Sequence, residues 1–310
     1  MKIQLGKRLV GDGEPCYIVG EIGINHSGSL DTAKRLIDAA AAAGADAVKF
    51  QKRTVETVYG RAPYPPGYLD QPRSHPLGGE QTQRGQKLAL EFDRTAWEIL
   101  AMHARAQGLD FTASCWDEQA LADVCEWVDP PWIKVASPST KDGPLLRAHC
   151  ETGKPLVVST GGMDADDVLE LYGNLRALKS VRNKPDEWVE PEESWVLLHC
   201  CSTYPAPDEH LNLKAICAMR SNLRCLVGYS GHERGIATTV AAMVWGACVV
   251  ERHLTLDRTM YGSDQAASLE PGGFARMVRD IRSVEAALGD GDKRPMPGEA
   301  EVMAKLRRVA

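Results

Sequence analysis

The strongest constraint on the fold is an alternation of short apolar runs, rich in Val and Ile, with segments of helical spacing along most of the chain. Eight runs are predicted to be strands, at residues 16–24, 45–50, 109–114, 132–137, 155–159, 195–200, 226–232 and 247–253. Predicted helices separate them, at residues 30–43, 93–107, 117–126, 144–151, 164–178 and 211–221, with an Ala/Val-rich helix before the last strand and one at 272–288 after it. Strands that alternate with helices indicate a parallel sheet.

Eight such units in 310 residues predict an α/β fold of one domain, a (β/α)8 TIM barrel. Two doubly wound halves fit less well, because the turn after the first strand, GINHSGS, is not a glycine-rich phosphate turn. We expect an N-terminal extension at 1–15, the barrel at 16–290 and a C-terminal tail at 291–310. A polar linker rich in Glu and Pro is expected before the strand at 195–200.

Residues 53–87 interrupt the alternation with clustered Pro, Gly, Tyr and polar residues. A loop of this length is uncommon in a compact domain unless it covers a site or a partner surface. We therefore interpret it as an inserted lid or an interface segment.

Charge and hydropathy exclude several classes of protein. The formal net charge of -6 gives no support for binding to nucleic acid or to an anionic membrane. No apolar stretch is long enough to cross a bilayer, and the N-terminus lacks the apolar core of a signal peptide. The expected location is the cytoplasm, and a homodimer is the expected assembly.

Polar residues follow the predicted strands where each strand ends, and active sites of barrel enzymes lie at that rim. The rim residues are Glu21, Lys49, Gln51, Ser114, Lys134, Ser137, Ser159, Ser202, Tyr204, Ser230, His232 and His253. Asp264 follows in a Gly/Ser turn that could reach the same rim.

His232 and His253 end neighbouring predicted strands, which places both imidazoles on one rim. A single histidine at a strand end is usually a surface or hydrogen-bonded residue. Two at equivalent ends, with a carboxylate in reach, suit a divalent metal such as manganese, iron or zinc.

Lys49 and Lys134 lie inside apolar strands, in AVKFQ and WIKVAS. A lysine there is desolvated and needs an anionic partner. That partner is either a buried Asp or Glu, or a phosphorylated or carboxylated ligand held with the nearby serine hydroxyls. A lysine of this kind also serves in Schiff-base aldolases.

The segments EIGINHSG, ADAVKFQKRT, IKVAS, STGG, LLHCCSTYP, GYSGH, ERHLTLD and GSDQAASLEP, in this order, resemble the sialic acid synthase family. The resemblance runs from about Cys16 to Leu288. It implies condensation of phosphoenolpyruvate with an aldose-type acceptor, such as N-acetylmannosamine, to give a 3-deoxy-2-ulosonic acid and phosphate by C–O cleavage.

The resemblance also implies roles for the rim residues. His232 and His253 would hold the metal, Mn²⁺ being the expected ion, and Glu21 would be the general acid or base. The residues implied for phosphoenolpyruvate are Lys49, Ser114, Lys134, Ser137, Ser159, Ser202 and Ser230. Those implied for the acceptor sugar are Gln51, Tyr204 and Asp264.

The sequence departs from the family pattern in two turns and at its end. The family's Ser-Asp-His turn is Ser230-Gly231-His232 here, and its Gly-Pro-Asp-His turn is Gly262-Ser263-Asp264-Gln265. The family's Thr and Asn of the phosphate site appear as Ser114 and Ser202. The given sequence stops where the family's antifreeze-like domain would begin. We therefore expect the acceptor's N-acyl group either to be recognised in another way or to be absent, which leaves open an acceptor other than N-acetylmannosamine.

Two alternatives stay open at this stage. A lyase or aldolase acting on an ulosonate would use Lys134 as its Schiff base. A non-catalytic homologue that binds a sugar or an anion is the other, and its support is the lack of the antifreeze-like domain in the given sequence and of the carboxylate at Gly231.

Overall fold

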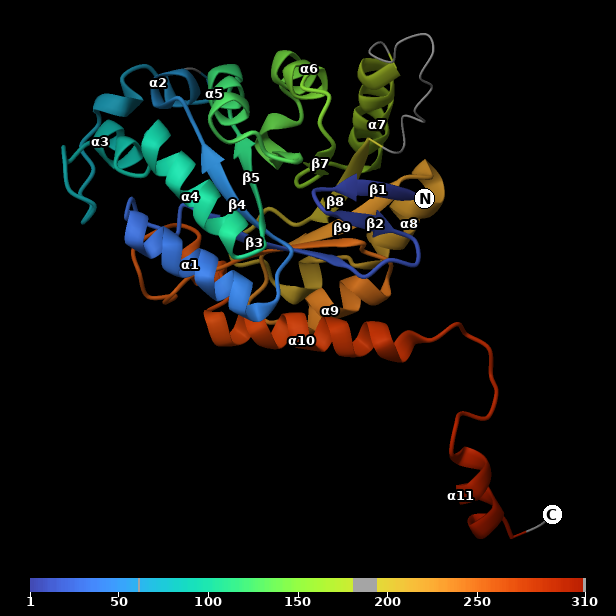
Figure 1. Cartoon of the computed structure of the whole chain (residues 1–310). Coiled ribbons are helices and arrows are strands. Elements are labelled where there is room, and N and C mark those ends of the chain that lie inside the picture. The colour runs from blue at the N-terminus through green and yellow to red at the C-terminus, as the bar shows by residue number, and fades with distance from the viewer. Residues whose placement is uncertain (61, 181–193, 309–310) are drawn as a thin grey trace.

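The computed structural model describes residues 1–60, 62–180 and 194–308, and within them eight parallel strands close into a barrel (Figure 1). Their order around the barrel is β10-β3-β4-β5-β6-β7-β8-β9. The strands are β3 (Tyr17–Gly23), β4 (Ala47–Lys52), β5 (Asp110–Cys115), β6 (Ile133–Val135), β7 (Leu156–Ser159), β8 (Trp195–Cys200), β9 (Leu226–Gly231) and β10 (Val249–His253). The predicted (β/α)8 barrel is confirmed.

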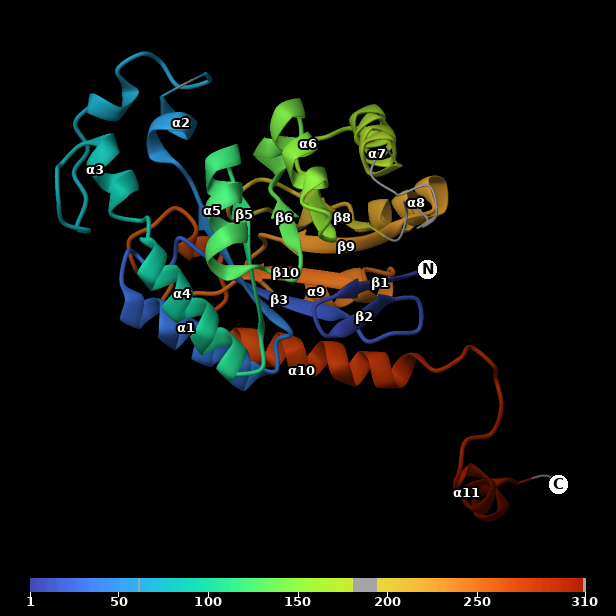
Figure 2. The ribbon, with the colours of Figure 1, turned by 45° about the horizontal axis from the view of Figure 1, so that its top comes forward.

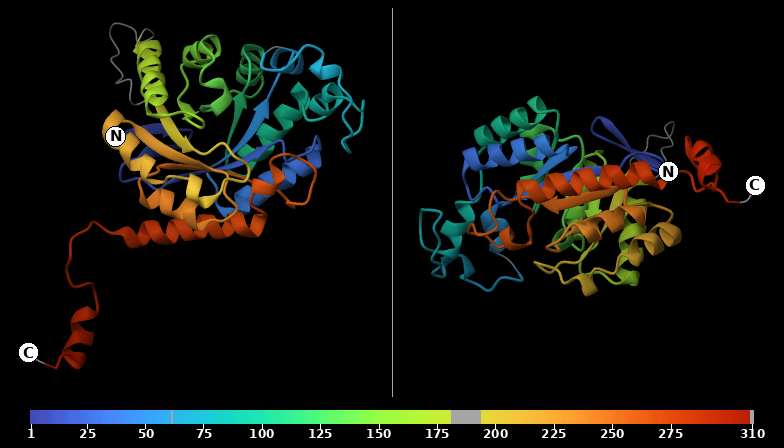
Figure 3. Two further views of the ribbon diagram at one scale, coloured as in Figure 1. Left: turned by 180° about the vertical axis from the view of Figure 1, so that it is seen from behind. Right: turned by 90° about the horizontal axis from the view of Figure 1, so that it is seen from below.

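A helix follows each barrel strand and covers the outside of the barrel (Figure 2). These helices are α1 (Leu30–Ala43), α4 (Arg94–Ala106), α5 (Glu118–Val128), α6 (Gly143–Glu151), α7 (Ala165–Ser180), α8 (Lys214–Leu223), α9 (Ala237–Val244) and α10 (Pro271–Leu288). The long α10 packs against both α1 and α9, which joins the end of the barrel to its beginning (Figure 3). Among the described helices, none has both the length and the apolar composition that a membrane crossing requires.

The ends of α1 show how local sequence sets the helix boundaries. The Ser29 hydroxyl accepts a hydrogen bond from the Thr32 amide, and Gly44 adopts a left-handed conformation at φ 82°. Gly44 then donates its amide to carbonyls of the last turn. Both signals were legible in the sequence.

Every second residue of a strand points into the barrel. These inward-facing side chains change from apolar to polar toward the carboxyl end of the strand. In β3 the inward row runs Tyr17, Val19, Glu21, and in β10 it runs Val249, Glu251, His253. The amino-terminal part of the barrel interior is therefore apolar and the carboxyl-terminal part is polar.

A hairpin closes the apolar end of the barrel. The segment 1–15, for which no strand was predicted, forms β1 (Lys2–Leu5) and β2 (Arg8–Gly11) as an antiparallel pair. Ile3, Leu5 and Val10 of this hairpin pack against inward residues such as Tyr17 and Trp132. Four-residue strands give too little pattern to be recognised in sequence, and the hairpin is stabilised by this tertiary contact.

The segment 53–87 is partly helical rather than a plain loop. It contains α2 (Val55–Tyr59), the 3-10 turn η1 (Tyr68–Asp70) and α3 (Gln83–Leu88). Tyr59, Tyr64 and Tyr68 pack ring against ring. This aromatic cluster gives the segment a small core of its own, which also includes Leu69.

Two predicted segments lie at the margins of the described residues. The linker rich in Glu and Pro falls mainly on 181–193, outside the described residues. After the barrel, α11 (Glu299–Leu306) stands apart from it at the end of an extended stretch (Figure 1). The division into extension, barrel and tail stays a prediction.

Candidate active site

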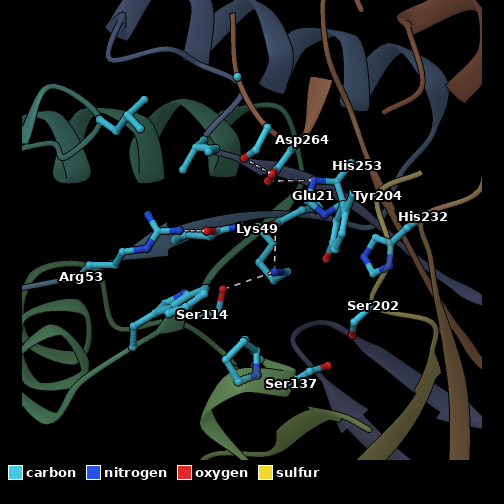
Figure 4. A pocket seen from close by; sticks show the side chains of 18 of the residues that line it. Glu21, Lys49, Arg53, Ser114, Ser137, Ser202, Tyr204, His232, His253 and Asp264 are labelled. Atoms are coloured by element: carbon cyan, nitrogen blue, oxygen red, sulfur yellow. Dashed lines mark hydrogen bonds and ion pairs between the residues drawn. The ribbon is translucent and has the colours of Figure 1, made fainter. Parts of the chain in front are cut away.

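A pocket of about 780 Å³ opens at the carboxyl ends of the barrel strands (Figure 4). The structure brings together on its lining all thirteen side chains that the sequence pointed to. They are Glu21, Lys49, Gln51, Ser114, Lys134, Ser137, Ser159, Ser202, Tyr204, Ser230, His232, His253 and Asp264.

Two lysines and two glutamates form the inner end of the pocket, named here the inner quartet: Lys49, Lys134, Glu21 and Glu251. Lys49 Nζ lies 2.9 Å from Glu21 Oε2 and 3.7 Å from Glu251 Oε1. Lys134 Nζ lies 3.6 Å from the same Glu251 oxygen. All four side chains are buried. The sequence left open whether the anionic partner of each lysine is a buried carboxylate of the chain or a bound ligand. The structure shows buried glutamates next to both lysines.

Sequence reasoning missed Glu251. The signal was available, because Glu251 precedes His253 by two residues in β10 and therefore faces the same side. Its carboxylate is the one that both lysines share.

Burial and charge act in opposite directions on the inner quartet. Burial alone would lower the pKa of Lys49, but Glu21 and Glu251 raise it above the ordinary value. Burial lowers the pKa of Lys134, and Glu251 offsets this only in part. The two lysines hold the pKa of Glu251 below its usual range despite its burial. The quartet therefore contains a firmly charged ammonium group on Lys49 and a firmly ionised carboxylate on Glu251.

Serine hydroxyls surround these lysines. Ser159 Oγ accepts from Lys134 Nζ at 2.7 Å, and Ser114 Oγ accepts from Lys49 Nζ at 3.4 Å. Ser230 Oγ donates to Glu251 at 3.2 Å. Hydroxyls next to ammonium groups supply the short donors that phosphate and carboxylate oxygens require.

The two rim imidazoles face each other, with ring centroids 5.4 Å apart. His232 Nδ1 lies 2.7 Å from the Cys201 carbonyl oxygen, so Nδ1 carries the proton and Nε2 keeps its lone pair. Burial and the neighbouring His253 lower the pKa of His232 to about 3. The Tyr204 ring packs 4.0 Å from the His232 ring and 5.7 Å from the His253 ring.

The donor set at this rim fits a divalent ion, although it is not a complete cage. His253 Nδ1 is buried without a hydrogen-bond partner and lies 3.6 Å from Asp264 Oδ2. A neutral His232 with a free Nε2 is the form that binds a metal. Within the described ranges, no three His, Cys, Asp or Glu side chains form a ready metal site. Two imidazoles with open positions for water and substrate is the arrangement these residues support.

A buried ion pair stands directly behind both histidines. Glu233 follows His232, Arg252 precedes His253, and Arg252 Nη1 donates to Glu233 Oε1 at 2.9 Å with both side chains fully buried. A Cβ on Gly231 would lie 2.6 Å from Glu233 Oε2 and 2.8 Å from Arg252 Cδ. Position 231 therefore has no carboxylate, whereas position 233 has one. Glu233 and its partner Arg252 occupy the space that a side chain at position 231 would need.

Sequence reasoning also missed the outer part of the pocket. Arg53, Arg73 and Lys87, named here the outer cationic lobe, line it together with Tyr59 and other residues of the segment 53–87. Arg53 stacks on Trp116, with its guanidinium carbon 4.7 Å from the ring centroid. The available signal was the presence of these three basic residues in a segment rich in tyrosine. No periodicity in that segment indicated that they would line one pocket.

The strand rim of a (β/α)8 barrel that joins buried lysines, hydroxyls and paired imidazoles is the site of a barrel enzyme. The NeuB family profile matches residues 36–293. N-acetylneuraminate-9-phosphate synthase of Homo sapiens is 38% identical over 300 residues, 96% of this chain and 78% of that protein. N,N'-diacetyllegionaminic acid synthase of Legionella pneumophila is 35% identical over 299 residues, 96% of this chain and 80% of that protein.

A solved structure agrees with these relatives. The N-acetylneuraminic acid (sialic acid) synthetase of Leptospira borgpetersenii, in complex with citrate, superposes with a TM-score of 0.80 at 28% identity, covering 100% of this chain and 98% of that one. The chain belongs to the NeuB family. The family and the enzyme class expected from the motifs are confirmed.

Proposed function

We propose that this protein condenses phosphoenolpyruvate with an aldose-type acceptor, giving a 3-deoxy-2-ulosonic acid and phosphate. The observation that carries the proposal is the convergence of thirteen side chains, drawn from almost every strand end, on one pocket in a chain of the NeuB family. The names of its relatives, synthases of sialic and legionaminic acids, support the same reaction class.

Phosphoenolpyruvate binds at the inner end of the pocket in this proposal. Lys49 and Lys134 supply positive charge, and the hydroxyls that donate to its phosphate and carboxylate are Ser114, Ser137, Ser159, Ser202 and Ser230. Because Glu21 and Glu251 already face the lysines, the serine donors carry much of the anion recognition.

Glu21 is the residue that moves the proton. Its carboxylate accepts from Gln51 Nε2 at 2.8 Å and lies beside Lys49, so it is held in one orientation. C3 of phosphoenolpyruvate attacks the acceptor's aldehyde carbon, water adds at C2, and phosphate leaves with its bridging oxygen. Glu21 exchanges the proton of the water or of the new hydroxyl.

His232 and His253 would hold a divalent metal, with Mn²⁺ as the proposed ion. When bound, it supplies Lewis-acid stabilisation of negative charge on the aldehyde oxygen. Gln51, Tyr204 and Asp264 line the pocket around the imidazoles and are proposed to position the acceptor. A cytoplasmic homodimer is the proposed form of the enzyme.

One observation favours a second candidate, an aldolase. The lowered pKa of Lys134, caused first by burial, is what a Schiff-base lysine needs. Its hydrogen bond to Ser159 and its proximity to Glu251 instead favour the charged ammonium form, which cannot attack a carbonyl carbon. Borohydride trapping of pyruvate on Lys134 would establish the aldolase function and would contradict the proposed synthase function.

The test of the synthase is phosphate release from phosphoenolpyruvate with Mn²⁺ and a panel of aldoses, with mass detection of the product. His253→Ala is expected to lower metal-dependent release on the order of 1,000-fold, because Lewis-acid stabilisation is worth several kcal/mol. His210→Ala, at an exposed histidine outside the pocket, is the matched control. Unchanged turnover in His253→Ala, with an unchanged melting temperature, would overturn the metal assignment.

A further inference from the structure

The outer cationic lobe carries positive charge that the described part of the chain does not balance. Arg53 shares the single carboxylate of Glu91 with Lys52, at 3.5 and 3.4 Å. Among the described residues no carboxylate lies within ion-pair distance of Arg73 or Lys87, whose ammonium instead lies 4.9 Å from the Tyr59 ring centroid. The lobe differs in this from the inner quartet, where every lysine has a glutamate.

The three cations line the same pocket, and the charges of Arg53 and Arg73 act on Lys87. Burial, and then the charges of Arg53 and Arg73, lower the pKa of Lys87 to about 8. Three like charges that line one pocket, with Glu91 as their single carboxylate partner among the described residues, create a positive potential that attracts an anion.

Two buried polar atoms in this part of the pocket also lack partners. Arg53 is 8% exposed and its Nε has no acceptor, and Gln86 is 7% exposed and its Oε1 has no donor. Gln86 Nε2 donates to the Tyr261 hydroxyl at 3.0 Å, which fixes the amide at the pocket wall. An unpaired donor and an unpaired acceptor that line one pocket suit a ligand that has both an anionic group and hydroxyls.

The lobe lies away from the imidazoles. Figure 4 shows Arg53 on one side of the pocket and His232 with Ser202 on the opposite side, with Lys49 between them. An acceptor whose aldehyde lies at the imidazoles, and which extends along the pocket, reaches the lobe with its far end.

We propose that the outer cationic lobe binds a phosphate monoester at the end of the acceptor remote from its aldehyde, so that the substrate is a phosphorylated aldose. The inference rests on the proposed synthase function and specifies its acceptor. Family membership leaves this choice open, because the products named for relatives include phosphorylated and unphosphorylated acids. A phosphate offers about two negative charges and three acceptor oxygens, which match three basic side chains better than a carboxylate does.

The test compares N-acetylmannosamine 6-phosphate with N-acetylmannosamine as acceptors, with phosphoenolpyruvate and Mn²⁺ present. The ratio of their kcat/KM values is expected to favour the phosphorylated sugar on the order of 100-fold. Lys87→Met, which keeps the apolar stem over Tyr59, and Arg73→Gln, at an exposed position, should each lower that ratio about tenfold or more. Lys214→Met, at an exposed lysine of α8 outside the pocket, should leave the ratio unchanged.

Three outcomes would overturn the proposal: a ratio near or below one, a higher KM for phosphoenolpyruvate in Lys87→Met with an unchanged ratio, or a preference for N-acetylmannosaminuronic acid over the phosphate. Calorimetry of the two sugars without phosphoenolpyruvate separates this proposal from the synthase reaction. If no acceptor turns over but the phosphorylated sugar binds more tightly and Lys87→Met removes the difference, the synthase fails and the lobe stands. If turnover occurs and neither measurement favours phosphate, the lobe fails and the synthase stands.

Discussion

The inner quartet and the outer cationic lobe both place positive charge in one pocket, but only the inner quartet pairs each of its cations with a carboxylate of the chain. Lys49 and Lys134 each lie within 4 Å of a glutamate. In the outer lobe, Lys87 lies over the Tyr59 ring, and both Lys87 and Arg73 line the pocket. The inner charges hold together without a ligand, whereas Arg73 and Lys87 gain a counter-charge only when an anion binds.

The two regions also differ in the elements that carry them. Glu21, Lys49, Lys134 and Glu251 project from barrel strands whose positions are fixed by hydrogen bonds on both sides. The outer lobe is built on the segment 53–87, with Arg53 before α2, Arg73 between η1 and α3, and Lys87 within α3. Rigid strands suit the chemical step, which needs fixed geometry, while an irregular segment is where specificity for the substrate's far end can vary.

The largest expected contrast comes from removing one lysine in each region. Lys49→Met leaves Glu21 buried without its cation, so the free energy of unfolding should fall by about 3–5 kcal/mol. Lys87→Met removes a cation that has only like charges near it, so stability should stay within about 0.5 kcal/mol or rise slightly. Urea denaturation of both variants at pH 7 measures the difference.

Lys49→Arg is the control for this pair, since it keeps the charge and changes the shape. Equal losses of stability in Lys49→Met and Lys87→Met would show that the outer lobe is balanced after all, and the distinction between the two regions would fail.

A smaller effect is expected at the support of the histidines. Gly231→Ala should lower the free energy of unfolding by about 1–3 kcal/mol, because the added methyl meets Glu233, Tyr229 and Arg252 closer than van der Waals distance. It should also lower kcat, since Glu233 and Arg252 adjoin His232 and His253 in the chain. Gly235→Ala, where a Cβ meets nothing within 4 Å, is the matched control. Gly231→Ala with wild-type stability and kcat would show that the pair can move freely.

The inner end was predictable because strand periodicity and rim position are both local properties of sequence. Lys49, Lys134 and the two histidines could be assigned to one rim once the alternation was recognised. Glu251 was missed although the same periodicity places it on the same face as His253, because it lies inside β10 and not at the end of the strand. The partner of each lysine depended on which side chains meet across the interior of the closed barrel, since Glu251 on β10 reaches Lys134 on the non-neighbouring strand β6. The pattern of one strand does not contain this information.

The outer lobe could not be predicted, since no repeating pattern places Arg53, Arg73 and Lys87 near one another. Their meeting depends on how the tyrosine cluster of 53–87 packs. The same holds for the hairpin of β1 and β2, which its contact with the barrel interior stabilises. The lack of room for a side chain at position 231 also depends on tertiary packing, because Glu233 and Arg252 occupy that space. The sequence therefore showed that the family's Asp is replaced by Gly231, but it did not show why.

The smallest expected effect is a pH dependence confined to the outer lobe. Lys87 on α3 faces Arg53 at the end of β4, Arg73, and Tyr59 on α2, and its pKa is lowered to about 8. The arginines stay charged and the pKa of Tyr59 is raised to about 12, so Lys87 is the group of this set that titrates near pH 8. As pH rises through 8, kcat/KM for N-acetylmannosamine 6-phosphate should fall by up to about tenfold, while kcat/KM for the unphosphorylated sugar should not share that fall.

This fall would reflect lost binding rather than unfolding. The folded-state pKa of Lys87 lies below its ordinary value of 10.5, so between pH 8 and 10.5 the unfolded chain holds more protons and the contribution of Lys87 to stability increases with pH. Lys87→Met should remove the difference between the two pH profiles. If both acceptors lose activity together above pH 8, the titrating group is not one that acts through the phosphate, and the assignment of the fall to Lys87 fails.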